Sequence, residues 1–135
     1  MAAFTKFQPF VDYLCDGDIN LSSDTLQVAL TTHGNTPAVG NGLLGDLTEI
    51  AYTNLSTQEI VTISSTQTAG VYSLVLTDLV LTATGDVATF RHVVVFDQTA
   101  TSDPLIAWFD YGSDVTLANG ETFTIDFGAS LFTLE

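Results

Sequence analysis

From residue 59 to the end of the chain, short apolar segments follow one another, with turn residues between them. The stretch Phe123 to Phe127 is typical, because apolar and polar residues alternate strictly in it after the turn signal Asn119–Gly120. A side-chain period of two marks a strand with one buried face. Threonine, which is β-branched and favoured on half-exposed strands, occurs 21 times against nine serines. The chain is therefore predicted to be β-rich.

The first half of the chain contains the exceptions to this pattern. Apolar residues at positions 7, 10, 11 and 14 form the stripe of a short amphipathic helix, which Asp16–Gly17 should end. Leu26 to Leu30 alternates and predicts a half-buried strand. Residues 33–45 hold four glycines and predict a long loop. After this loop, Asp46 and Glu49 resemble a capping box and predict one helical turn.

The second half holds most of the predicted strands. The segment Val71 to Leu81 changes the parity of its apolar residues at Thr77–Asp78, which predicts a bulge or corner there. No repeat or linker divides the chain, so we predict one domain over residues 1–135. Its fold class is all-β, a β-sandwich or jelly roll with one short N-terminal helix. The other predicted strands are Ile60 to Ile63, Val87 to Phe96, Leu105 to Tyr111 and Phe132 to Leu134.

Charge limits the partners that this chain can have. The chain has 16 acidic residues and two basic ones, Lys6 and Arg91, so its formal net charge is −14. Such a chain cannot neutralise phosphates, and long-range repulsion opposes its association with nucleic acid or anionic membranes. In an assembly that contains nucleic acid, we expect it on the outside. The charge also has a simpler explanation, which is solubility alone.

Cysteine content and the N-terminus suggest where the chain is made. Cys15 is the single cysteine, which excludes an intrachain disulfide, and its apolar-periodic surroundings predict a buried small hydrophobe. The segment Met1 to Lys6 has no basic region followed by an apolar run, so we expect no signal peptide. No apolar run is long enough for a membrane-spanning helix. We expect synthesis in a cytoplasm.

Candidate catalytic and metal-binding groups are few. His33 lies in a glycine-containing loop and His92 on the apolar face of a strand, and no nucleophile motif accompanies either one. The run Asp16 to Asp24 has oxygen ligands at alternate positions, as a calcium loop would. It lacks the glycine and the glutamate that such a loop needs, so solvated carboxylates are the preferred interpretation. We expect no enzyme activity, metal or cofactor.

The densest aromatic run is Trp108, Phe109 and Tyr111. In a strand, Trp108 points to one side and the other two to the opposite side, so both faces carry apolar surface. The first interpretation is a central strand that is buried on both faces. The second is that one face meets a neighbouring subunit, because aromatic residues anchor protein interfaces.

Four segments resemble small structural proteins of tailed bacteriophages, a family that includes head decoration (cement) proteins and tail-fibre proteins. The similarity covers nearly the whole chain and implies a non-enzymatic virion component that is present in many copies. The segments are the short aromatic helix followed by Asp24 to Leu30, then Val61 to Tyr72, Asp103 to Gly112 and Gly120 to Phe127.

The resemblance implies a function that we state as an expectation. The chain would be a capsid decoration protein, made in the host cytoplasm, that binds the major capsid protein on the outer surface of the virion and bridges coat subunits. It would form a homo-oligomer, a dimer or a trimer. A knob on a tail or head fibre that binds a receptor is the alternative, and a small hydrolase of host surface polymers is a third. The candidate partner-contact residues are Phe4, Phe7, Phe10, Pro37, Trp108 and Tyr111.

Overall fold

Strands make up most of the regular structure. The structure, a computed structural model, describes residues 4–134; residues 1–3, where part of the signal-peptide expectation falls, and residue 135 lie outside it. The all-β class with one short helix is confirmed, while the sandwich or jelly-roll arrangement stays a prediction. The elements are β1 (Thr5–Lys6), α1 (Pro9–Cys15), β2 (Leu26–Thr31), the 3-10 turn η1 (Leu44–Asp46), β3 (Glu59–Ile60), β4 (Thr62–Thr68), β5 (Val71–Leu76), β6 (Leu79–Thr82), β7 (Phe90–Asp97), β8 (Leu105–Val115), β9 (Thr122–Ile125) and β10 (Thr133–Leu134).

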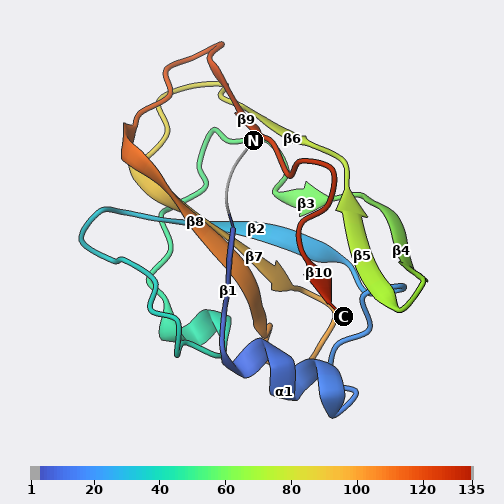
Figure 1. Ribbon diagram of the computed structural model, residues 1–135. Coiled ribbons are helices and arrows are strands. Elements are labelled where there is room, and N and C mark those ends of the chain that lie inside the picture. Colours follow the sequence, from blue (N-terminus) through green and yellow to red (C-terminus); the bar gives the residue numbers. More distant parts are fainter. Residues whose placement is uncertain (1–3, 135) are drawn as a thin grey trace.

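These strands form three antiparallel sheets within the described residues. The largest has the order β1-β8-β7-β2-β3, a second has the order β10-β5-β4, and β6 pairs with β9 alone. In Figure 1, β2, β7 and β8 cross the middle of the molecule, and the β4–β5 hairpin stands at one side. Helix α1 lies below the large sheet, and β6 and β9 run along the top.

The break predicted within residues 71–81 is confirmed. Strand β5 ends at Leu76 and β6 begins at Leu79, so the chain leaves one sheet and enters another across Thr77–Asp78. Asp78 Oδ1 accepts the backbone N–H of Phe127 at 3.0 Å. This bond ties the corner to the C-terminal segment.

Strand β2 is more deeply buried than its alternating sequence predicts. Ala29 and Thr31, on the face expected to be polar and half-exposed, are fully buried. The strand lies inside the large sheet between β7 and β3, and the Tyr52 hydroxyl accepts the Leu30 N–H at 3.0 Å. Because five of its six residues are buried, the prediction of a half-buried strand was wrong.

The helical turn expected after Asp46 instead ends at that residue. Turn η1 spans Leu44–Asp46, and Asp46 Oδ2 accepts the N–H groups of Gly42 at 2.9 Å and Leu43 at 3.0 Å. These two bonds hold the pKa of the Asp46 carboxyl below its ordinary value. Aspartate can satisfy free N–H groups on either side of itself, and here it closes the turn that precedes it.

The predicted N-terminal helix is confirmed, but its cysteine is not buried. Helix α1 spans Pro9–Cys15, and Gly17 follows with a φ of 85°, a left-handed conformation that glycine adopts freely. Cys15 is exposed. It lies one turn after Val11, which is 42% exposed, so these two residues are on the outer face of the helix. The expectation of a buried Cys15 was wrong.

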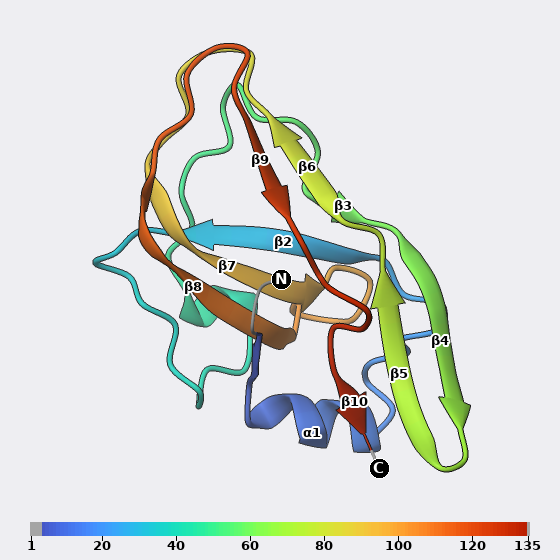
Figure 2. The same cartoon turned by 45° about the horizontal axis from the view of Figure 1, so that its top comes forward.

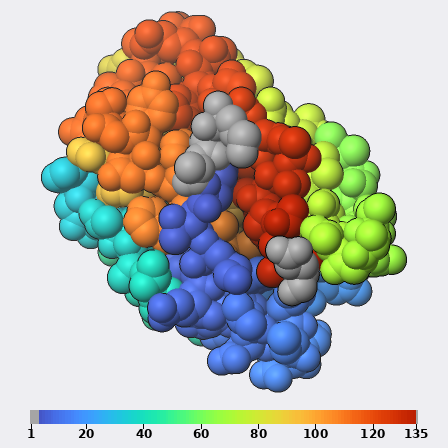
Figure 3. Space-filling model, in the orientation of Figure 1, coloured from blue at the N-terminus to red at the C-terminus, as the bar shows by residue number. Residues whose placement is uncertain are grey.

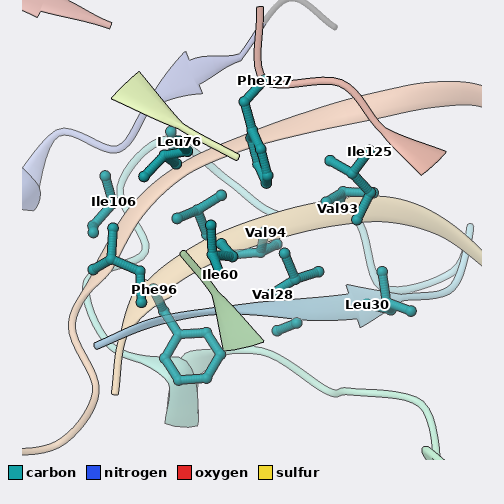
Figure 4. Packing of buried hydrophobic residues seen from close by; sticks show 14 of the residues in the cluster. Val28, Leu30, Ile60, Leu76, Val93, Val94, Phe96, Ile106, Ile125 and Phe127 are labelled. Carbon is teal, nitrogen blue, oxygen red and sulfur yellow. The ribbon is translucent and has the colours of Figure 1, made fainter. Parts of the chain in front are cut away.

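One hydrophobic cluster joins the three sheets. Val28 and Leu30 of β2 and Val93 and Val94 of β7 contribute to it from the large sheet. Leu76, Ile125 and Phe127 reach it from the other two sheets and the segment after β9 (Figure 4). In the space-filling view of Figure 3, the N-terminal segment lies between β8 and the C-terminal segment. The two ends of the described chain thus close the same side of the core.

Candidate interaction surface

Three of the six candidate contact residues lie inside the protein. The side chains of Phe7 and Phe10 have no exposed surface, and Pro37 is buried as well. The Phe10 ring packs against Phe132 with 5.3 Å between ring centroids, and Phe7 packs against Trp108 at 6.3 Å. These phenylalanines hold α1 and β1 against the sheets, and their side chains offer a partner no surface.

Phe4 and Trp108 occupy an intermediate position. The Phe4 ring lies 5.0 Å from that of Phe109 and 5.6 Å from that of Phe127, and all three belong to the core or its margin. Trp108 is partly buried, and its Nε1 has no hydrogen-bond partner within residues 4–134. A buried indole N–H is normally hydrogen-bonded, so the Trp108 N–H is an exception to this rule.

Tyr111 is the candidate whose side chain is mostly exposed, at 51%. It lies in the second half of β8, beyond Trp108 and Ala107, the residues that pair with β1 within the described part of the chain. Its ring stands on Phe123, with 5.1 Å between ring centroids. The prediction that this aromatic strand is buried on both faces was therefore wrong for its second half. Strand β8 also continues four residues beyond Tyr111, the end that we predicted, to Val115.

The most exposed large apolar residues lie elsewhere, at the start of β4, where Val61 directly precedes the strand and Ile63 is its second residue. Val61 and Ile63 are each 62% exposed. We missed them because the run Ile60 to Ile63 predicts a strand without indicating which of its faces is covered. A signal was present in the sequence: from Ile60 to Thr77 no residue is charged, although the chain as a whole carries 16 acidic residues. The β4–β5 hairpin, Thr62–Leu76, lies within this uncharged stretch.

A polar cluster contains Arg91 and His92 of β7, Asp110 of β8 and His33 from the loop after β2. Arg91 Nε donates to Asp110 Oδ1 at 2.8 Å, and Arg91 Nη1 lies 2.9 Å from His33 Nδ1. His92 Nε2 lies 3.8 Å from Asp110 Oδ2. The Arg91 guanidinium, assisted by the Gly112 N–H, holds the pKa of the Asp110 carboxyl below its ordinary value. The positive charge of Arg91, one of the two cationic side chains, is thus paired with Asp110 within the protein.

His92 itself is shielded from solvent. Its side chain is 1% exposed, and Nδ1 lies 3.1 Å from the carbonyl oxygen of Thr32 and 3.2 Å from Oγ1 of Thr31. A carbonyl oxygen can only accept, so Nδ1 carries the proton in this arrangement. The hydroxyl that His92 contacts belongs to Thr31, which has no exposed surface. A general base and a nucleophile enclosed in this way are out of reach of a substrate.

A buried carboxylate that the sequence did not single out lies beside the acidic loop. Asp97, at the end of β7, has no exposed surface; its Oδ1 accepts the N–H groups of Thr99 at 2.9 Å and Ala100 at 3.0 Å. No donor reaches its Oδ2 within the described residues, where the neighbouring side chain is Asp24. Burial, reinforced by Asp24, raises the pKa of Asp97 to about 7.

This carboxyl pair changes the interpretation of the Asp16–Asp24 loop. Asp24 is partly buried and faces Asp97, while Asp16 and Asp18 are exposed. Within residues 4–134 no group of three or more histidine, cysteine, aspartate or glutamate side chains is arranged to hold a metal ion. Asp24 is thus the loop carboxyl that lies beside the buried Asp97 of β7, where it helps to raise the pKa of Asp97.

An open groove of about 400 Å³ lies between this loop and the hairpin. Leu14, Ile19 and Leu21 form its apolar side. On the other side, the hydroxyls of Ser65 and Tyr72 lie 2.7 Å apart and satisfy each other. The volume lies within the range of small-molecule sites, but the polar groups on the hairpin side are already paired.

No helix within the described residues is long and apolar enough to cross a membrane. Comparison of this chain with protein-family models, with curated proteins and with solved structures finds no match.

Proposed function

We propose that this chain is a capsid decoration protein, which binds the outer surface of a bacteriophage head and stabilises the shell by bridging coat subunits. The observation that carries the proposal is the distribution of charge. The chain has 16 acidic residues and two cationic ones, and Arg91, one of these two, is paired with Asp110 at 2.8 Å. A surface of this kind is repelled by packaged nucleic acid, which favours the outer face of the shell. The resemblance to phage structural proteins supports the same location.

We also propose that the protein acts by binding and not by catalysis. Support comes from His92, which is enclosed together with Thr31, and from the solvent-exposed His33, whose Nδ1 lies 2.9 Å from the Arg91 guanidinium. Apolar side chains, in contrast, are available to a protein partner at Val61, Ile63 and Tyr111. Contacts of this kind to two coat subunits at once would oppose their separation, and many copies would make the effect cumulative.

The test is a binding experiment with purified capsids that lack the protein. Saturable binding of many copies per capsid, in a fixed ratio to coat subunits, is the expected result. Binding to a few sites or only to tails would contradict the proposal. Capsids with and without packaged DNA should bind equally if the site is on the outer surface, as proposed.

A receptor-binding knob on a fibre is the second candidate, and the exposure of Tyr111 favours it. Sugar rings stack on exposed aromatic side chains, and Tyr111 is 51% exposed, with its ring packed against Phe123. The discriminating experiment measures binding to host cells and to capsids for the wild type and for Tyr111→Ala. Loss of cell binding, with no binding to capsids in either protein, would select the fibre role.

A further inference from the structure

Strand β4 is an open edge. It is the last strand in the order β10-β5-β4, and within residues 4–134 β5 is the one strand that pairs with it. The turn between β4 and β5, Ala69–Gly70, has φ values of 53° and 83°. Two left-handed residues form the turn type whose twist matches that of the flanking strands. The hairpin is thus well formed, and Figure 2 shows β4 on its outer side, away from the other sheets.

Charged residues and prolines usually protect an edge strand from pairing with another chain, and β4 contains neither among its seven residues. A register shift between Thr62 and Ser64 interrupts the start of the strand, and the pairing from Ser64 to Thr68 is regular. Alternate residues of an edge strand direct their N–H and C=O groups outward, ready to pair with another strand. Val61 and Ile63, each 62% exposed, add apolar surface beside this edge.

Strands β1, β3, β6 and β9, which also lie at sheet edges, are less suited to pairing. Strand β3 has two residues, of which Glu59 is charged, and β1 has two residues, of which Lys6 is charged. Strands β6 and β9 have four residues each, and acidic residues lie within a few positions of their ends. These acidic residues are Asp78, Asp86, Glu121 and Asp126.

Charge determines which partner fits β4. Two copies that each carry −14 repel one another, and the repulsion is strongest where carboxylates face carboxylates within the screening length of about 8 Å. The uncharged run Ile60 to Thr77 is a surface that a second acidic copy can approach with little local repulsion. A basic partner would gain nothing from this surface. An edge that pairs with itself needs no complementary charge, because a two-fold axis places the same residues on both sides.

We propose that β4 pairs antiparallel with β4 of a second copy of this chain, about a two-fold axis near the middle of the strand. The three-stranded sheets of the two copies then form one continuous sheet. A strand pair buries less surface than a standard protein interface, so the dimer is expected to be reversible. This inference refines the expected homo-oligomer to a dimer and does not depend on capsid binding.

Sedimentation velocity over a range of protein concentrations measures the dimer. The test variant is Ile63→Glu, and the matched control is Val80→Glu on β6, because Val80 is also apolar and 50% exposed. Both variants add one negative charge. The wild type and Val80→Glu should show the same monomer–dimer equilibrium, and Ile63→Glu should raise the dissociation constant at least about tenfold. Far-UV circular dichroism and thermal melting confirm that each variant is folded.

A cross-linking experiment tests the geometry. In a Cys15→Ser background, Thr66→Cys places a thiol near the proposed axis and should form an intermolecular disulfide under mild oxidation, whereas Thr124→Cys on β9 should not. A wild type that stays monomeric at its highest soluble concentration would overturn the proposal. So would equal effects of the Ile63 and Val80 variants. If Ile63→Glu abolished capsid binding by a monomeric wild type, the edge would belong to a coat-protein strand.

Discussion

The Asp97→Asn substitution should change how the stability of this protein depends on pH. Asp97 is fully buried; its Oδ1 accepts two backbone N–H groups, and its Oδ2 faces Asp24 without a donor. Two carboxylates cannot donate to each other, so the contact with Asp24 needs one proton. Burial and the Asp24 charge raise the pKa of Asp97 to about 7, against an ordinary value of about 3.9 in the unfolded chain.

The sign and size of the effect follow from this difference. Because the folded state holds the Asp97 proton more tightly, the stabilisation is complete below about pH 4 and is lost as the pH rises through about 7. A shift of three units corresponds to at most about 4 kcal/mol. Asp24 is partly exposed and solvent screens the pair, so we expect about half of that, roughly 2 kcal/mol. Asparagine keeps the oxygen that accepts the Thr99 and Ala100 N–H groups and supplies a permanent donor toward Asp24.

Urea unfolding followed by the fluorescence of Trp108, the single tryptophan, measures the free energy of unfolding between pH 5 and pH 9. Asp97→Asn should be close to the wild type at pH 5 and more stable than it by about 2 kcal/mol at pH 8 to 9. Asp46→Asn is the control without a pH slope in this range, because backbone N–H groups lower the pKa of Asp46 and its stabilisation is lost only below about pH 4. A difference between the wild type and Asp97→Asn that stays constant from pH 5 to pH 9 would refute the reasoning.

Three further predictions concern the fold. Phe10→Ala should lower the free energy of unfolding by about 3–5 kcal/mol in urea denaturation, because the ring is fully buried; a loss below about 1 kcal/mol would contradict this packing. Gly70→Ala should cost about 1 kcal/mol, because Gly70 has a φ of 83° with no atom near the added Cβ, whereas Gly45→Ala, which has space and no left-handed backbone, should cost nothing. Cys15 should react with a thiol reagent in the native protein at the rate of an exposed cysteine, and protection until unfolding would place it in the core.

The local sequence predicted well the elements that can be recognised from the spacing of their own apolar residues. The corner at Thr77–Asp78 was visible because the apolar residues change parity there, and Asp78 is a residue that fits a corner. Helix α1 was visible from its apolar spacing and from the Gly17 that follows it. Both features depend on neighbours within one or two turns of the chain, which is the range that periodicity describes.

The features that the sequence left open depend on contacts between distant segments. Ala29 and Thr31 are compatible with either face of a strand, so their burial depends on what covers β2. The pairing of Leu26 with Asp97 in the β2–β7 register brings Asp24 to its partner carboxyl, and no local pattern links positions 24 and 97. The candidate surface was also missed for this reason. Ile63 is exposed and Phe7 is buried, although both are apolar residues, and only contacts between distant segments decide which of them is covered.

The most direct test of the proposed function is the temperature at which DNA-filled capsids lacking this protein release their DNA. The release temperature is measured with and without the protein at saturating concentration, and dye binding to the released DNA reports the event. If the protein bridges coat subunits on the outer surface, the release temperature rises with occupancy and reaches a plateau when the sites are full. An unchanged release temperature at full occupancy would contradict the account.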